Sequence, residues 1–297
     1  MIALILSILC ALIINTIFKL YAKYQVDTFT AIVINYWVCV ITGAIMEGIN
    51  PFQAQVLQSP WLGNAIVLGF LFIFGFVTMG LTLKYFSLAI GTIMQKMSLM
   101  ISVPFGILMF NEGLSLAKII GLCCALVAII LTNLPNKSST EILDKVPNKT
   151  PILYWAFPLF TLLSSATIES ILQYTQHSIL AQANNQESAL FSMFSFLMAA
   201  IIGLIGIIII AFRKGIKITT KSWIAGIALG IPNYFAIYFL ILAMGWKDKS
   251  IVLPINNVAV IILSIVVGYI AFKEYLSKIN LLGIATAIAA IILISMA

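Results

Sequence analysis

The chain has 297 residues, of which 62% are hydrophobic and 8% are charged, and its formal net charge is +7. A soluble domain carries about 25% charged residues, so this composition excludes an ordinary soluble protein. The lysines and arginines are spread over the ends of apolar segments and form no single basic patch. The positive charge therefore indicates no nucleic-acid partner, and the lipid bilayer is the predicted surrounding.

Ten apolar segments of about 20 residues follow one another along the chain, each long enough to cross a bilayer core of about 30 Å. The first segment lacks the basic start of a secretory signal peptide and is too long for one, so we interpret it as a retained helix. The connections are short, and none is long enough to fold as a separate domain. The sequence therefore predicts an all-α membrane protein with ten transmembrane helices. The predicted spans cover residues 2–22, 28–47, 62–84, 88–110, 115–134, 152–173, 189–212, 222–245, 250–271 and 277–296.

A sequence repeat relates the two halves of the chain. Residues 93–131 align without a gap with residues 255–293, and 13 of these 39 positions are identical. Each half holds five predicted spans, and an odd number means that the second copy enters the membrane in the opposite direction. Inverted repeats are typical of secondary transporters, which hold substrate near the middle of the membrane between the repeats. We predict a first five-helix repeat at residues 1–134, a linker at 135–150 and an inverted second repeat at 151–297.

The joint between the fourth and fifth spans is nearly the same in both halves, as FNEGLSLAKIIG and FKEYLSKINLLG. Ser115 and Ser277 stand where a helix is predicted to begin, and serine is a good N-cap. The glutamate before each serine suits the positive end of the helix that follows. We interpret both joints as structural.

The joint has the pattern Glu-x-Leu-Ser followed by a glycine, formed by Glu112, Leu114, Ser115 and Gly121 and again by Glu274, Leu276, Ser277 and Gly283. Ten spans in two groups of five, with this joint in each group, resemble the drug/metabolite transporter superfamily, EamA type. The resemblance covers essentially the whole chain. It implies a secondary carrier or exporter of amino acids, metabolites or related small organic molecules.

The basic residues are distributed unequally between the two sides of the membrane. With ten spans, the loops opposite the termini hold 12 lysines and arginines, and the loops on the terminal side hold 3. The positive-inside rule then places both termini outside the cell and the linker in the cytoplasm, for a protein of the cytoplasmic membrane. Well-studied bacterial members of the resembled superfamily are generally described with their termini inside, which is the opposite expectation.

Lys96 lies in the middle of a predicted span, and residues 87–110 hold no other charge. Placing an ammonium group near the bilayer centre costs about 3 kcal/mol on insertion scales, and such residues are usually functional. The alternative is a snorkelling lysine whose ammonium reaches the lipid headgroups. Because Lys96 lies about 12 Å along the helix from the start of its span, we favour a lysine that lines a cavity and contacts an anionic group of the substrate.

Several polar residues at similar depth are candidates for the same site. Gln95 precedes Lys96, and Asn256 and Asn257 occupy the positions of the second repeat that align with 94 and 95. Glu169 is the one acid that lies inside a predicted span at a suitable depth. It is therefore the candidate counter-ion for Lys96, or the candidate group that binds a coupling ion. An interfacial glutamate is the equal alternative.

Further polar groups lie inside other spans, where each has an alternative role as a hydrogen bond between helices, worth about 0.6 kcal/mol. Pro254, which precedes the two asparagines, can kink its helix and free carbonyl groups toward a cavity. The remaining candidates for substrate contact are Asn15, Asn35, Tyr36, Asn233 and Tyr234.

Enzyme classes fit the sequence poorly. It has no metalloprotease, nucleophile-elbow or P-loop motif, no pair of acids inside the membrane, and no metal-ligand spacing, so we predict no catalysis, metal or cofactor. We predict a secondary transporter of small organic metabolites that works by alternating access, with the coupling to a proton or another ion and the formation of a homodimer left open. The alternative is a non-transporting membrane sensor or scaffold, whose polar residues need not converge on a cavity.

Overall fold

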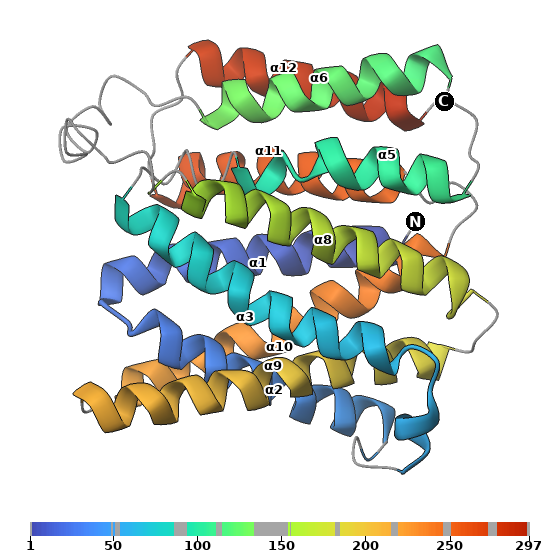
Figure 1. Ribbon diagram of the computed structural model, residues 1–297. Coiled ribbons are helices and arrows are strands. Elements are labelled where there is room, and N and C mark those ends of the chain that lie inside the picture. The colour runs from blue at the N-terminus through green and yellow to red at the C-terminus, as the bar shows by residue number, and fades with distance from the viewer. Residues whose placement is uncertain are drawn as a thin grey trace. The chain divides into compact units, whose positions relative to one another are not determined.

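The computed structural model describes residues 2–48, 50, 54–85, 94–110, 115–133, 154, 156–181, 185–214, 219–245, 251–272 and 278–295. All regular structure within these ranges is helical, as Figure 1 shows. The chain divides into two compact units. Unit 1 comprises Met1–Ile73 and Ile171–Trp246, and unit 2 comprises Phe74–Ser170 and Lys247–Ala297. The predicted linker at 135–150 lies outside the described residues.

The helices of the described ranges follow the order of the predicted spans. A short 3-10 helix, η1 (Ala54–Gln58), precedes the third. The α-helices are α1 (Ile2–Tyr24), α2 (Thr28–Glu47), α3 (Leu62–Tyr85), α5 (Leu99–Phe110), α6 (Leu116–Asn133), α8 (Ala156–Ser178), α9 (Asn185–Lys214), α10 (Thr220–Met244), α11 (Val252–Phe272) and α12 (Lys278–Ser295).

The main departure from the prediction falls in the fourth span, which was expected to run without a break from 88 to 110. Residues 94–96 form a helical turn, Met97 and Ser98 form a non-helical turn, and α5 begins only at Leu99. The backbone N–H groups of Ile101 and Ser102 both donate to the carbonyl of Ser98, which marks the first turn of α5. The helix is therefore interrupted directly after Lys96.

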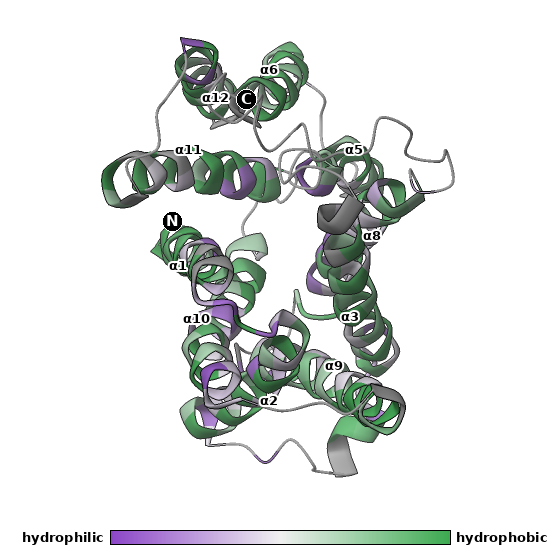
Figure 2. Cartoon of the chain, turned by 90° about the vertical axis from the view of Figure 1, so that its left-hand side faces the viewer, coloured by the Kyte–Doolittle hydropathy of each residue, from purple (hydrophilic) through white to green (hydrophobic). Residues whose placement is uncertain are grey.

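Several helices have the length and composition of membrane spans. Thr28–Glu47, Leu62–Met79, Gln186–Phe212 and Thr220–Met244 are each long and apolar enough to cross a bilayer, and shorter apolar stretches lie in α1, α5, α6, α11 and α12. Hydrophobic residues dominate the helices in Figure 2. Large apolar side chains such as Leu108 and Phe212 are exposed, as lipid-facing residues are. These helices indicate an integral membrane protein, while ten crossings remain a prediction.

Unit 1 is held together by close packing around α2, which contacts α9 and α10, while α1 packs on α10. Two glycines of α10 make the close approach to α2 sterically possible. A Cβ atom at Gly230 would lie 2.5 Å from the Cβ of Val38 and 2.8 Å from the carbonyl oxygen of Asn35. A Cβ atom at Gly226 would lie 2.7 Å from the carbonyl oxygen of Ala31. The glycines four residues apart in α10 are therefore packing residues, as small residues in membrane helices commonly are.

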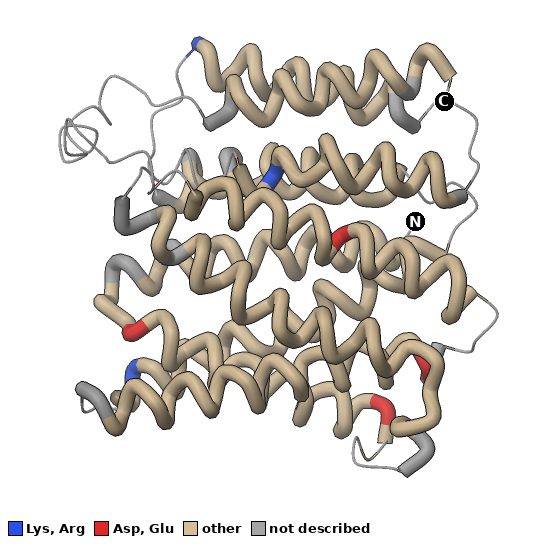
Figure 3. Tube along the Cα trace, viewed as in Figure 1, with Lys and Arg blue, Asp and Glu red and all other residues tan. Residues whose placement is uncertain are grey.

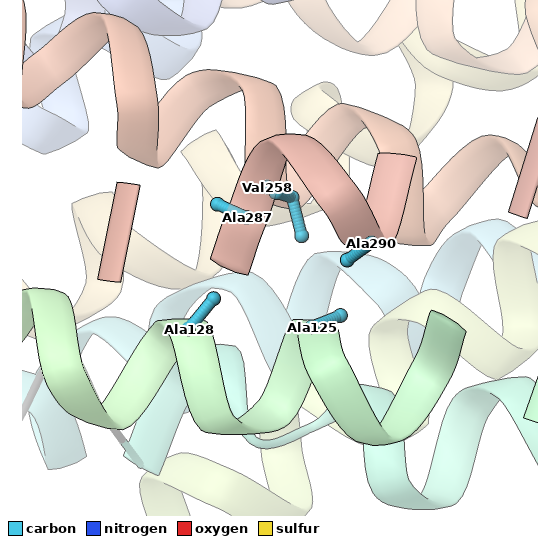
Figure 4. Packing of buried hydrophobic residues seen from close by; sticks show 5 residues of the cluster. All are labelled: Ala125, Ala128, Val258, Ala287 and Ala290. Carbon is cyan, nitrogen blue, oxygen red and sulfur yellow. The ribbon is translucent and has the colours of Figure 1, made fainter. Parts of the chain in front are cut away.

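In unit 2, α6 packs on α12 along a row of small residues (Figure 4). Ala125 and Ala128 of α6 and Ala287 and Ala290 of α12 form a buried cluster with Val258 of α11. The alanines are repeat partners, since each pair is separated by the repeat spacing of 162 residues. The bounds of α6 and α12 differ by the same 162 residues at both ends. The sequence repeat is thus also a repeat of helix boundaries and of packing residues.

The joints between repeat helices are only partly within the described residues. Glu112, Leu114, Glu274, Leu276 and Ser277 lie outside them. Ser115 directly precedes α6, and its carbonyl accepts from the N–H of Ile119 at 3.2 Å. This is the position of an N-cap residue, as predicted for this serine.

We predict that Gly230→Ala destabilises the protein by about 1–3 kcal/mol, because the added methyl group overlaps backbone as well as side-chain atoms of α2. Gly63→Ala in α3 is the matched control, since a Cβ atom there meets nothing within 4 Å. Thermal unfolding of the two purified variants in the same detergent measures the difference. Equal melting temperatures would contradict the close packing of α10 on α2.

Candidate functional site

Charged residues are sparse along the described helices (Figure 3), which makes the surroundings of each one informative. Lys96 ends the helical turn that precedes the break before α5. Its Nζ donates a hydrogen bond to Oδ1 of Asn257 in α11 at 2.9 Å. The structure therefore brings together two residues that the sequence analysis assigned to one site.

Glu169 of α8 lies on the other side of the same asparagine. Its Oε1 accepts from Nδ2 of Asn257 at 3.1 Å, and its Oε2 accepts from Oγ of Ser102 in α5 at 2.6 Å. Asn257 is 4% exposed and Ser102 is fully buried. The result is a continuous chain of hydrogen bonds, Lys96–Asn257–Glu169–Ser102, which we call the Asn257 network and which lies wholly within unit 2.

The chemistry of an amide explains why an asparagine occupies the central place. Its carbonyl oxygen accepts from an ammonium group and its NH₂ group donates to a carboxylate, so one side chain satisfies both charges. Hydrogen bonds to charged groups are stronger than those between neutral groups. The positive charge of Lys96 and the negative charge of Glu169 thus balance each other across Asn257.

The start of α11 places Asn257, and it does so without a kink. Pro254 is the third residue of α11, where a backbone N–H would have no partner inside the helix in any case. Pro254 therefore removes no hydrogen bond from inside α11, so its position gives no reason for a kink that would free carbonyl groups toward a cavity. The interruption lies instead at Met97 and Ser98 of the first repeat.

The two repeats use equivalent positions in different ways. The repeat partner of Lys96 is Val258, which is buried in the cluster with the alanines of α6 and α12. Gln95, the repeat partner of Asn257, is exposed, and Asn256 is 8% exposed. The site is therefore not symmetric.

The other predicted site residues belong to unit 1. Nδ2 of Asn233 in α10 donates to Oδ1 of Asn35 in α2 at 3.2 Å, and Sγ of Cys39 lies 3.7 Å from the same oxygen. These contacts join α2 to α10, so they fit the alternative role of amides as bridges between helices. Asn15 of α1 is exposed.

Two tyrosines accompany the asparagines of unit 1. Tyr36 stacks against Phe72 and Phe196 at centroid distances of 6.2 and 6.0 Å. Tyr234 is fully buried and packs against Gly43, and its hydroxyl has no hydrogen-bond partner among the described residues. An aromatic packing role accounts for Tyr36.

The sequence did not indicate two serines as residues of the site. Ser98 and Ser102 are both fully buried, and Ser98 occupies the helix break while Ser102 binds Glu169. Serine is common in membrane helices, so a single serine carries little signal. The sequence feature that could have indicated Ser102 is its identity with Ser264 at the equivalent position of the second repeat.

We predict that removing either charge of the Asn257 network destabilises the fold by about 3 kcal/mol, because the other charge is left buried without compensation. Lys96→Met and Glu169→Gln are the single variants. Their combination should cost clearly less than the sum, since a neutral pair needs no compensation. Thermal unfolding of the purified proteins closes this double-mutant cycle, and strict additivity would show that the two charges are independent.

The chain is similar to proteins of known sequence or structure. A protein of Haemophilus influenzae (strain ATCC 51907 / DSM 11121 / KW20 / Rd), described as an uncharacterized protein, is 26% identical over 296 residues, which cover 97% of this chain and 95% of that protein. A solved crystal structure superposes with a TM-score of 0.76 at 16% identity, over 99% of this chain and 96% of the other, and this shows a shared fold. Residues 1–134 match the model of the EamA-like transporter family. This match confirms, over residues 1–134, the resemblance to EamA-type transporters of the drug/metabolite transporter superfamily that the sequence pattern indicates.

Proposed function

We propose that the protein is a secondary transporter that binds a small organic substrate at the Asn257 network and moves it by alternating access. The match of residues 1–134 to a family of membrane transporters and the apolar helices support the general class. The observation that carries the proposal is the hydrogen-bond chain Lys96–Asn257–Glu169, with one cation and one anion held by a single amide.

The bonding pattern of this amide suggests the substrate class. Asn257 presents an acceptor to Lys96 and a donor to Glu169, which is the pattern that a carboxylate and an ammonium group on one small molecule would also present. A zwitterion offers the same two contacts with full charges, and charge-assisted hydrogen bonds are about twice as strong as neutral ones. Amino acids or related compounds are therefore the proposed substrates, with the carboxylate on Lys96 and the ammonium group on Glu169.

Alternating access is supported by the pairing of equivalent helices. Three pairs of equivalent helices from the two halves pack together, namely α2 with α9, α5 with α11 and α6 with α12, while α10 of the second half also packs on α1 and α2 of the first. Two related halves that meet through equivalent helices can exchange their conformations, which is the principle of inverted-repeat transporters. The inverted orientation of the second half remains part of the proposal.

The competing function is a membrane sensor or scaffold that transports nothing. Such a protein would hold the Asn257 network as a structural link, and no substrate would compete for Lys96 or Glu169. Purified protein in liposomes separates the two functions, because only a transporter gives substrate-dependent uptake that saturates.

We predict that Lys96→Ala weakens substrate binding by about ten- to a hundredfold, the loss expected when a hydrogen bond to a charged group is removed. Lys84→Ala, near the end of α3, is the matched control and should bind normally. A thermal-shift screen of the purified protein against amino acids, organic acids and amphipathic drugs identifies the ligand, and titration gives the affinities. Lys96→Arg should also bind more weakly, because the planar guanidinium has a different shape from the ammonium group.

Normal transport by Lys96→Ala would overturn the role of Lys96. The lysine would then be a structural member of the Asn257 network, and the transporter proposal would depend on the repeat and the family match alone.

We further predict that the termini lie outside the cell and residues 134–150 lie in the cytoplasm, because of the 12 basic residues on that side against 3 on the other. A cysteine introduced at position 140 of a cysteine-free protein should resist an impermeant thiol reagent in intact cells, and a cysteine added at the C-terminus should react. The reverse pattern of labelling would show that the orientation is opposite.

A further inference from the structure

A cavity lies within unit 1, between the start of α3, the end of α8 and the start of α9. Its volume is about 280 Å³, and it is open on one side. Ligand pockets usually measure about 300–1,000 Å³, so this cavity suits a small molecule. All the residues that line it belong to unit 1, and none of them is a member of the Asn257 network.

A buried tryptophan orients the one acid that lines this cavity. Nε1 of Trp61 donates to Oε2 of Glu187, the third residue of α9, at 2.7 Å. Trp61 is 1% exposed, and it packs edge-on against Phe191 and Phe194 at centroid distances of 5.9 and 6.1 Å. This bond takes one of the roughly four acceptor positions of a carboxylate, so it fixes the direction of Glu187 without exhausting its capacity to accept hydrogen bonds.

The two segments that build the cavity supply no lysine or arginine. Residues 48–83 hold no charged residue, and residues 170–212 hold Glu187 as their single acid. His177 is the one histidine of these segments, and the formal charge takes it as neutral. In the Asn257 network, by contrast, the acid and the lysine balance each other. The cavity therefore has a negative charge, which favours a cationic ligand.

The walls of the cavity indicate what the cation should carry. Pro60, Ile179 and Leu180 line it with apolar groups, while Gln58 and Ser59 add neutral polar groups. A metal ion needs several oxygen ligands and would leave the apolar walls unused. An ammonium group on a small apolar body matches both the carboxylate and the walls. A soluble amine also fits better than the headgroup of an ethanolamine lipid, because the cavity offers no lysine or arginine to the phosphate.

We propose that this cavity binds a small organic ammonium ion, whose charged group contacts Glu187 and whose apolar part packs on Pro60, Ile179 and Leu180. Trp61 acts as a positioning residue, because it holds the carboxylate in one direction. The site is additional to the Asn257 network, and it does not depend on the proposed transport function.

The test measures binding of isopentylamine to the full-length purified protein by isothermal titration calorimetry. Binding should saturate, and isopentyl alcohol, which has the same carbon skeleton without the charge, should bind at least about tenfold more weakly. Glu187→Gln should lower the affinity for the amine about ten- to a hundredfold, while its amide oxygen still accepts from Trp61. Glu47→Gln, at the half-buried end of α2, is the matched control and should bind the amine like the wild-type protein.

A second variant keeps the test decisive if Glu187→Gln is unstable. Ile179→Trp should fill the cavity and abolish binding of the amine while the carboxylate stays in place. Leu57→Trp is its control, because Leu57 is 68% exposed on η1 and does not line the cavity.

The proposal is overturned if the amine shows no saturable binding, if the alcohol binds as tightly, or if Glu187→Gln and Glu47→Gln bind the amine alike. The last result would show that the amine occupies another acid, such as Glu169. Tighter binding of phosphoethanolamine than of isopentylamine would also overturn it, in favour of a lipid headgroup. An effect of Glu187→Gln on thermal stability without any binding of amine would leave Glu187 as a structural link to Trp61.

Discussion

Two opposite charges inside an apolar helical unit have to be compensated by the protein itself, because a membrane interior supplies no water to solvate them. Here the compensation passes through one amide. Asn257 accepts from Lys96 and donates to Glu169, and Ser102 fills a second position on the same carboxylate. Each of these side chains comes from a different segment, so the network also ties α5, α8 and α11 together.

Close packing by small residues brings helices together in each of the two units. In unit 2, alanines of α6 and α12 meet at repeat-equivalent positions, and in unit 1, Gly226 and Gly230 of α10 let the backbone of α2 approach closely. Helices in lipid gain little from the hydrophobic effect on association, so packing of this kind is their main attraction.

The repeat is regular where it packs and irregular where it carries charge. The bounds of α6 and α12 agree at the repeat spacing, yet Lys96 corresponds to the core residue Val258, and the helix break at Ser98 corresponds to a continuous stretch of α11. A site with one lysine and one glutamate needs such asymmetry, because two identical copies would supply two like charges. The two repeats therefore share their packing residues but differ at the positions that carry the charged groups.

The sequence by itself determined the order and approximate limits of the helices, the repeat, and the choice of Lys96, Asn257 and Glu169 as candidate site residues. These follow from apolar length, from identities at a fixed spacing, and from the high cost of a charge in lipid. It did not determine that Asn257 bridges the two charges, that Ser102 binds Glu169, or that the break lies at Ser98 and not at Pro254. Those features depend on how each helix is rotated about its axis and which helix lies beside it. In helices that are apolar on every face, hydrophobic periodicity carries little information about rotation, so only the packing of helices distant in the chain decides it.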